Sequence, residues 1–359
     1  MKKITVSIAV LALVMQVAVC GTAFSSDHTP AAAERTENTA AAGAAEMAGP
    51  ETAADNLPDR PETFHFDPHV HTELISEVCR EEWWESFYNL CDAICSGADT
   101  FECCEKDAYI WCTDDTTLST FFPAACTLVK GDGYEDGVGH ISYQRPKDEI
   151  LARQKAFEEE IERMINEAVR PDYTDFEKCL ALFDYISSHF TYDDDPVDGQ
   201  GIDDFSNYAC LMSKKGICCE IAGSYTYLLL QCGIEAADMS GDGTAGAHDW
   251  TYIVIDGKGY HADVTWTLHG DFPDDPCSLV YFLQTDDERA ADGFEKDSFK
   301  PDLICYWKND YDRTVFAAED NRYRALHEDG WTTLLDMNTD RKVIRYKNIN
   351  DEVLEFRYE

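Results

Sequence analysis

Two runs of alternating residues flank the dipeptide Asp256-Gly257, and this pattern constrains the fold of the chain more than any other. His248–Ile255 precedes the dipeptide and Tyr260–Thr267 follows it. Alternation with a period of two indicates β-strands, and Asp-Gly between two such runs is a strong signal for a type I′ hairpin. The sequence therefore predicts an antiparallel hairpin whose register is set by a two-residue turn.

The register of this hairpin determines which side chains share a face. With Asp256 and Gly257 at the centre of the turn, His248 becomes a diagonal neighbour of Asp263. Diagonal neighbours lie about 7–8 Å apart, so their side chains can reach each other. The opposite face, which we expect to be core, carries Ile253, Ile255, Ala262 and Val264. A slip of one residue would separate His248 from Asp263.

A helix is predicted upstream of the hairpin, over about Cys218–Cys232. Its apolar and small side chains recur at helical spacing, and Gly233 is typical of the residue just beyond a helix C-terminus. Cys218 is at the N-terminus, where free N–H groups and the partial positive charge of the helix stabilise a thiolate. A thiolate nucleophile needs a histidine, which needs an orienting carboxylate, and His248 and Asp263 are the candidates.

Other elements are predicted with less consequence for function. Pro146 opens a helix that runs to about Val169, and a second helix begins at Thr174, which forms a capping box with Glu177. The acidic segment 193–204 is interpreted as a solvated loop, because it fails the calcium-loop pattern. Near the C-terminus, residues 342–346 and 353–358 are predicted to pair as strands.

Three motifs, in this order, resemble the transglutaminase-like superfamily of papain-like cysteine enzymes. Gly216-Ile-Cys-Cys-Glu-Ile-Ala222 resembles the family's Gly-Val-Cys helix start, His248-Asp-Trp250 its His-Ala-Trp strand, and Tyr260-His-Ala-Asp263-Val-Thr-Trp266 its Asp-x-Thr-Trp strand. The resemblance covers roughly residues 146–290, under half of the chain. It implies an α+β fold of transglutaminase-like or papain-like type, with the nucleophile helix packed on an antiparallel sheet that carries the histidine and the aspartate.

The resemblance also implies roles for individual residues. Cys218 would be the nucleophile, His248 the general base and acid, and Asp263 the residue that orients the histidine. The oxyanion would be held by the Cys218 backbone N–H and by a side-chain donor, for which Tyr192 is the candidate. Trp250 is a packing residue that could line the cleft. The family's reactions are acyl transfers through a thioester, namely Gln–Lys crosslinking, deamidation and amide hydrolysis, and we expect no cofactor and no metal.

The sequence departs from the family pattern close to the nucleophile. Cys219 and Glu220 replace the usual residue-plus-glycine after the cysteine, Asp249 stands where alanine is usual, and Thr251 stands where asparagine is usual. A carboxylate of Glu220 or Asp249 close to the sulfur would disfavour the thiolate. These departures bear on the substrate and the rate more than on the triad itself.

The N-terminus accounts for the large number of cysteines. Lys2 and Lys3 precede an apolar run over residues 4–19 and then small residues, which is the pattern of a secretory signal peptide, predicted over residues 1–23. Cys20 gives the alternative of a lipid anchor at the cell surface. A secreted, extracellular location favours disulfides among the fifteen cysteines. We expect no transmembrane span in the mature chain.

Charge and composition set the remaining boundaries. With 29 Lys+Arg against 70 Asp+Glu, the net charge of −41 excludes a nucleic-acid partner. We divide the rest of the chain into a disordered linker rich in Ala, Glu, Thr and Pro (24–65), a cysteine-rich module (66–145), a catalytic core (146–290) and a C-terminal extension with strands (291–359). In the module, disulfide staples are the first interpretation and zinc the alternative.

We therefore expect a secreted or surface-tethered cysteine acyl-transfer enzyme that acts on protein or peptide amides as a peptidase or amidase, or as a protein-glutamine transglutaminase or deamidase. Hydrolysis is slightly favoured, because an accepting amine needs a second shaped site. The alternative is a catalytically inert binding or structural module on the same fold, with Cys218 oxidised. A further hypothesis is that the cysteine-rich module caps the cleft as a regulatory segment.

Overall fold

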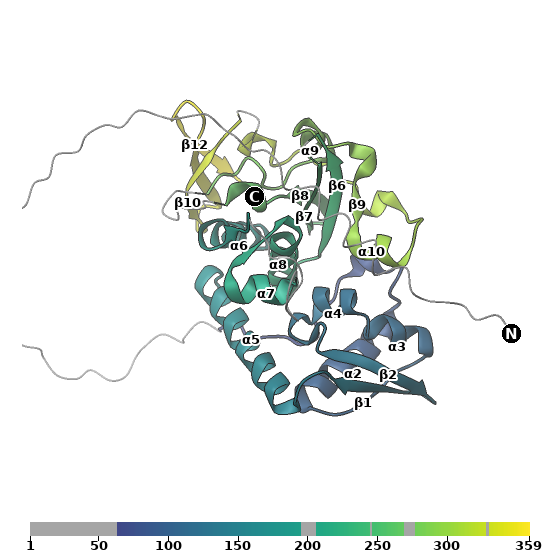
Figure 1. Ribbon diagram of the computed structural model, residues 1–359. Coiled ribbons are helices and arrows are strands. Elements are labelled where there is room, and N and C mark those ends of the chain that lie inside the picture. Colours follow the sequence, from purple (N-terminus) through teal and green to yellow (C-terminus); the bar gives the residue numbers. More distant parts are fainter. Residues whose placement is uncertain (1–62, 195–205, 245, 269–276, 328–329) are drawn as a thin grey trace, which may run out of the picture. The chain divides into compact units, whose positions relative to one another are not determined.

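A four-stranded antiparallel sheet with one helix beside it carries the predicted hairpin (Figure 1). The strand order is β8-β7-β6-β9, with the bounds β6 Ala236–Gly243, β7 Gly246–Ile255, β8 Lys258–Ala262 and β9 Lys300–Pro301. Helix α8 (Cys218–Gln231) lies against β6 and β7. Hydrogen bonds from Thr251 Oγ1 to Ala222 O, at 3.1 Å, and from Thr226 Oγ1 to Thr251 Oγ1, at 3.2 Å, join the helix to β7. The fold is α+β, as the sequence predicted.

This structure is a computed structural model that describes residues 63–194, 206–244, 246–268, 277–327 and 330–359 (Figure 1). The predicted signal peptide, Cys20 and nearly all of the predicted linker lie outside the described residues, as does most of the acidic loop that follows residue 194. In the part of the chain that is described, no helix is both long and apolar enough to span a membrane.

The hairpin has the predicted turn and the predicted register. Asp256 and Gly257 have φ values of 52° and 70°, as a type I′ turn requires, and Ile255 pairs with Lys258. The second strand is shorter than predicted, because β8 ends at Ala262 and a 3-10 helix, η4 (Thr265–Thr267), follows it. The Asp263 carboxylate accepts the backbone N–H of Trp266 at 3.3 Å, which stabilises this change of direction.

The predicted helices are confirmed with small changes in their bounds. Helix α5 spans Lys147–Ala168 and α6 spans Asp175–His189. The capping box of α6 is present, because the Thr174 side chain accepts from Glu177 N and the Glu177 carboxylate accepts from Thr174 N. The remaining elements of the central region are β4 (Thr191–Tyr192), α7 (Asn207–Ser213), β5 (Lys215–Gly216), α9 (Asp286–Ala291), η5 (Lys296–Ser298), α10 (Asp302–Trp307), η6 (Arg313–Phe316) and η7 (Arg324–Leu326).

The segment predicted as a cysteine-rich module folds around aromatic side chains. It contains η2 (Glu73–Ile75), α2 (Glu81–Ser96), β1 (Thr100–Glu102), α3 (Lys106–Cys112), α4 (Asp115–Phe121), η3 (Pro123–Ala125), β2 (Val129–Glu135) and β3 (Val138–Tyr143). The ring of Trp84 meets those of Trp111 and Phe121 edge-to-face, with centroids 5.2 and 4.9 Å apart. That this segment is a separate module remains a prediction, because buried side chains from Val70 to Tyr358 form one continuous cluster.

The structure does not show the predicted disulfide staples, since no two described cysteines lie at disulfide distance. In the segment 66–145, Cys91 and Cys112 are fully buried, and Cys79, Cys103 and Cys126 are nearly so. Buried cysteine behaves as a small apolar side chain, so these thiols contribute to the core through packing. Burial also raises the pKa of the Cys126 thiol to about 12, which keeps it neutral and unreactive.

A three-stranded sheet near the C-terminus packs on helix α6. Its strands are β10 (Thr333–Asn338), β11 (Val343–Lys347) and β12 (Val353–Arg357), of which β11 and β12 were predicted and β10 was not. Just beyond β12, the ring of Tyr358 stacks on Phe176 at a centroid distance of 4.4 Å. The Tyr358 hydroxyl donates to the buried Glu177 carboxylate, which also pairs with Lys342 Nζ at 3.2 Å.

The contact between Tyr358 and Glu177 gives a test of this packing. Burial acts to raise the pKa of Glu177, but the Tyr358, Thr174 and Lys342 donors lower it overall. We expect Tyr358→Phe to reduce the free energy of unfolding by about 1–3 kcal/mol in urea denaturation at neutral pH, because a buried carboxylate loses a donor. Since the pKa of Glu177 is lowered on folding, the loss should shrink as the pH falls through that pKa. The control is Tyr306→Phe, whose exposed hydroxyl contacts Asp114; an equal loss there would contradict the argument.

Candidate active site

His248 and Asp263, predicted to be diagonal neighbours, are in contact. His248 Nε2 lies 2.8 Å from Asp263 Oδ2, and the two side chains are respectively 11% and 1% exposed. His248 comes from β7 and Asp263 directly follows β8, so the hairpin register brings them together. The rings of Trp266 and Phe294 stack on the imidazole of His248 at centroid distances of 5.1 and 5.8 Å.

Arg289 on α9 is a third member of this cluster that the sequence did not single out. Its side chain is fully buried, and its Nη2 donates to Asp263 Oδ2 at 2.5 Å, the same oxygen that contacts His248. The guanidinium carbon lies 4.5, 4.8 and 4.3 Å from the ring centroids of Trp250, Trp266 and Phe294. The aromatic faces therefore stabilise the cation where water is excluded.

The electrostatics of Asp263 fix the tautomer of His248. Burial acts to raise the pKa of Asp263, but the His248 and Arg289 charges and their hydrogen bonds hold it below its usual value. Asp263 is therefore ionised at neutral pH and only accepts hydrogen bonds, so His248 Nε2 must carry the hydrogen. In the neutral ring Nδ1 then has no hydrogen, which makes Nδ1 the basic nitrogen.

Cys218 is the first residue of α8, and its thiol points to the start of β7. Cys218 Sγ lies 3.5 Å from Asp249 Oδ2, and Asp249 directly follows His248 in the chain. Cys218 is 7% exposed. The structure therefore places the predicted nucleophile beside the strand that carries the predicted base.

Glu220 and Asp249, the two acidic departures from the family pattern, have different environments. The Glu220 carboxylate turns back to accept the backbone N–H of Ile217 at 3.0 Å, so it caps α8. Asp249 instead contacts the Cys218 sulfur directly. Asp249 is therefore the carboxyl group that, when ionised, would disfavour the Cys218 thiolate.

The backbone places Tyr192, the predicted oxyanion donor, next to the strand that leads to the nucleophile. Strand β4 pairs in parallel with β5, with Tyr192 opposite Gly216, two residues before Cys218. Asp193 N donates to Gly216 O at 2.9 Å and extends this pairing. The pairing brings Tyr192 to the N-terminal end of α8, but its role as an oxyanion donor remains a prediction.

Trp250 and His261 form a buried layer behind the histidine–aspartate pair. Trp250 is 1% exposed. That it lines a cleft stays a prediction. Its indole N–H donates to His261 Nδ1 at 2.8 Å, and His261 Nε2 lies 2.9 Å from Asp286 Oδ1. Burial holds the pKa of His261 below its usual value, and the Trp250 bond fixes its tautomer. His261 is thus a structural histidine.

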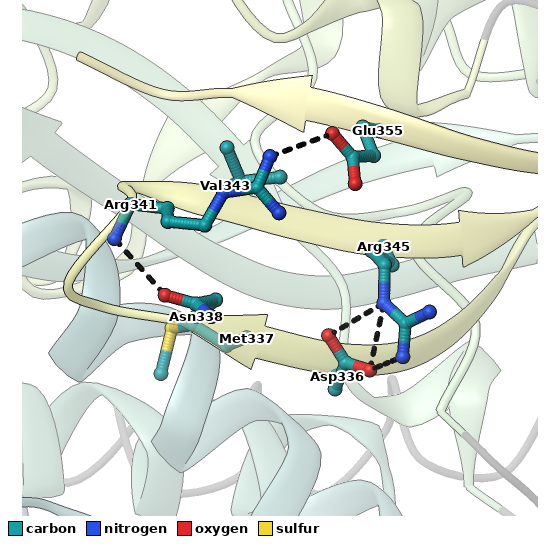
Figure 2. Close-up of a pocket in the computed structure, with 7 residues that line it drawn as sticks. All are labelled: Asp336, Met337, Asn338, Arg341, Val343, Arg345 and Glu355. Carbon is teal, nitrogen blue, oxygen red and sulfur yellow. Dashed lines mark hydrogen bonds and ion pairs between the residues drawn. The ribbon is translucent and has the colours of Figure 1, made fainter.

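A separate surface pocket lies on the C-terminal sheet and contains none of the predicted site residues (Figure 2). It is lined by Asp336, Met337, Asn338, Arg341, Val343, Arg345 and Glu355. Its charges pair with each other, Arg345 with Asp336 and Arg341 with Glu355. Within the described ranges, no cluster of three or more His, Cys, Asp or Glu side chains could hold a metal ion, and this includes the alternative zinc site in the 66–145 segment.

Arg289 could not be found from local sequence patterns. It lies in the acidic stretch 285–297, where an arginine is normally interpreted as a surface residue. Its partner Asp263 is 26 residues away, and the contact depends on how the segment after β8 returns along the sheet. That return is fixed by Asp263 N donating to Tyr281 O, at 2.9 Å, and by the His261–Gln284 bridge.

Residues 162–264 match the family model described as the Transglutaminase-like superfamily. No curated protein gives a significant match. Solved structures that resemble part of the chain include a TGase (16% identity, TM-score 0.28, covering 38% of this chain and 45% of that one), a proposed cysteine protease from Cytophaga hutchinsonii (14%, 0.25, 39% and 62%) and a proposed protease from Parabacteroides distasonis (15%, 0.23, 37% and 35%). The chain covers less than two thirds of each of these structures.

Removal of Arg289 should expose the energetic cost of the buried Asp263 charge. We expect Arg289→Met to lower the free energy of unfolding by about 3–5 kcal/mol, because one partner of a buried ion pair is lost. The matched control is Arg345→Met on the C-terminal sheet, whose partner Asp336 is 42% exposed, and whose loss should cost about 1 kcal/mol or less. Urea denaturation of both variants at neutral pH measures the difference. Equal losses would show that Asp263 does not depend on Arg289.

The same pair predicts a pH dependence of stability. The pKa of Asp263 is lowered on folding. Its contribution to the free energy of unfolding is therefore complete above the pKa of the unfolded chain, about 3.9, and is lost as the pH falls through the pKa of the folded protein. The stability difference between the parent protein and Arg289→Met should therefore narrow in strongly acidic solution. A constant difference across the acid range would contradict an ionised Asp263 as its source.

Proposed function

We propose that the protein is a cysteine acyl-transfer enzyme that acts on protein or peptide amides, starting from the match of residues 162–264 to the model of the Transglutaminase-like superfamily. The single observation that carries the proposal is the buried His248–Asp263 pair at 2.8 Å, located next to the residue that contacts the Cys218 sulfur. The proposal requires the His248 imidazole to reach the Cys218 thiol, because an imidazole that is oriented by a buried carboxylate activates a cysteine at a helix N-terminus.

In the proposed reaction Cys218 is the nucleophile and His248 takes up and gives back protons. The Cys218 thiol gives its proton to His248 Nδ1, and the thiolate attacks the carbonyl carbon of the amide. The tetrahedral intermediate collapses to a thioester when the C–N bond breaks, and the leaving amine takes the proton from His248. Water or a second amine, deprotonated by His248, then attacks the thioester and releases Cys218. Asp263 stays ionised and stabilises the imidazolium throughout.

The oxyanion of the tetrahedral intermediate needs donors on the side opposite the leaving amine. Cys218 is the first residue of α8, so its backbone N–H belongs to the turn whose amides have no partner within the helix. We assign Tyr192 as the side-chain donor, and the pairing of Tyr192 with Gly216 supports this role. A backbone and a side-chain donor together would form the oxyanion hole.

The proposal includes a location outside the cytoplasm. The signal-peptide pattern over residues 1–23 supports secretion, and Cys20 supports a lipid anchor as the alternative. In an oxidising compartment some of the thiols would form disulfides, and the exposed residues Cys95 and Cys104 are the accessible ones in the 66–145 segment. The alternative function is an inert binding or structural module on the same fold, in which Cys218 would be oxidised.

Selective alkylation tests whether Cys218 is activated. We expect iodoacetamide to label Cys218 of the folded, non-reduced protein faster at about pH 6–7 than in the denatured chain, because an activated cysteine is a thiolate below the usual thiol pKa of about 8.5. His248→Ala should slow this labelling at least about tenfold. His189→Ala, which removes a histidine of α6 outside the pair, is the matched control, and peptide mapping separates Cys218 from Cys219. Labelling of Cys218 at the denatured rate would reject the enzyme and favour the binding module.

The oxyanion assignment predicts a specific kinetic defect. Once a peptide amide substrate is found, Tyr192→Phe should lower kcat about 100-fold or more and leave KM nearly unchanged, because the hydroxyl would act only in the transition state. Steady-state kinetics with and without an added primary amine would also separate hydrolysis from transamidation. A Tyr192→Phe enzyme with the parent kcat would assign the donor to another residue.

A further inference from the structure

Three aspartates lie close together beside the sheet that α8 contacts. Asp249 lies on β7 and Asp238 lies on β6, while Asp302 is the first residue of α10. In the antiparallel register Ser240 is opposite Asp249 and Asp238 is opposite Thr251. Asp238 and Asp249 are therefore diagonal neighbours on one face, which is the face that meets the N-terminal end of α8.

Hydrogen bonds connect this cluster to the nucleophile. The Cys218 sulfur lies 3.5 Å from Asp249 Oδ2, and the Asp249 and Asp302 side chains are hydrogen-bonded to each other. Ser240 Oγ donates to Asp302 Oδ1 at 2.5 Å, which fixes the position of that carboxyl group. Asp238 Oδ1 is buried and has no hydrogen-bond partner.

A hydrogen bond between two carboxyl groups needs a proton, because two carboxylates offer only acceptors. Burial and the charge of Asp302 raise the pKa of Asp249 well above its usual value, and burial raises that of Asp302. Burial likewise raises the pKa of Asp238 to about 7. The other titratable groups that face the cluster are Cys218 and Cys219 from α8, Lys300 from β9 and Cys305 from α10. The cluster therefore holds more carboxyl groups than cations, which favours retention of a proton.

We propose that Asp249 and Asp302 share one proton, and that this proton controls the reactivity of Cys218. This inference rests on the proposed function, and it names the group that regulates the same site. With the proton present, the pair carries one negative charge instead of two, so Asp249 repels the neighbouring Cys218 thiolate less. When the proton leaves, the pair carries two negative charges, and Asp249 becomes an acceptor that holds the hydrogen on the Cys218 thiol.

The proton balance separates the two states. In the active state the Cys218 proton is on His248 and the shared proton is on the Asp249–Asp302 pair, so the thiolate faces a pair with a single negative charge. In the inactive state the shared proton has gone to solvent. The Cys218 thiol keeps its own proton and donates a hydrogen bond to the Asp249 carboxylate. The enzyme is therefore expected to work in acidic to neutral solution and to lose activity as the pH rises. An ordinary thiol shows the opposite trend, because its thiolate fraction increases with pH.

Alkylation of Cys218 across about pH 6–9 in three single variants tests this proposal. In the parent protein the labelling rate should fall as the pH rises. Asp249→Asn carries a permanent N–H donor and no charge, so the fall should disappear, and the variant should label more than about tenfold faster than the parent at the alkaline end. Asp302→Asn removes the negative charge that keeps the proton on Asp249. The fall in the labelling rate should therefore move to lower pH by about one unit or more.

The matched control is Asp242→Asn, which removes an exposed carboxylate from the same strand as Asp238. Its profile should coincide with that of the parent. The proposal is overturned if Asp249→Asn keeps the alkaline fall, if Asp302→Asn does not displace it, or if Asp242→Asn displaces it equally. Loss of the alkaline fall in Asp249→Asn and its displacement to lower pH in Asp302→Asn, with an unchanged control, support it.

Infrared difference spectroscopy gives a readout that does not depend on Cys218 reactivity or on correct folding of both variants. The parent protein at neutral pH should show a C=O band of a protonated carboxyl group that Asp302→Asn loses, whereas the band of Asp238, whose pKa burial raises to about 7, should remain in both proteins. If the band is present and Cys218 is unreactive at all pH values, the shared proton stands and the proposed function fails. If Cys218 is activated and the band is absent, the proposed function stands and this inference is overturned.

Discussion

The buried charge of Asp263 is the constraint on which the rest of the site depends. A carboxylate that is 1% exposed must be compensated where it lies, and His248 and Arg289 both donate to the same oxygen. This requirement is met by the hairpin register, which brings His248, and by the return of the chain to α9, which brings Arg289. It also determines which nitrogen of His248 is basic. The chemistry proposed for the site therefore follows from how one negative charge is accommodated.

The predictions from sequence succeeded where a local pattern decides the structure. Asp256-Gly257 sets both the turn and the register, so the contact between His248 and Asp263 could be derived without any knowledge of the rest of the fold. The capping box at Thr174 and the start of α8 at Cys218 are local in the same sense. Their signals depend on spacings of a few residues, within which backbone geometry leaves few alternatives.

The features that were missed depend on contacts between distant parts of the chain. Arg289 meets Asp263, and Asp302 meets Asp249, only after the segment beyond β8 has returned along both edges of the sheet. The burial of the cysteines was missed for a related reason. Their number indicated crosslinks, but the structure buries most of them as single apolar side chains, and burial cannot be derived from a count. The sequence thus identified the reacting groups and their common face but not the charges that surround them.

The arginine held among aromatic rings also gives the molecule an internal optical reporter. The guanidinium of Arg289 lies 4.5 Å from the ring centroid of Trp250 and 4.8 Å from that of Trp266, and both indoles belong to the wall around the histidine. Indole emission responds to a nearby positive charge, so the colour and intensity of tryptophan fluorescence depend on whether this cation is in place. The state of the buried ion pair can therefore be followed by tryptophan fluorescence in the unmodified protein, without a substrate and without an attached dye.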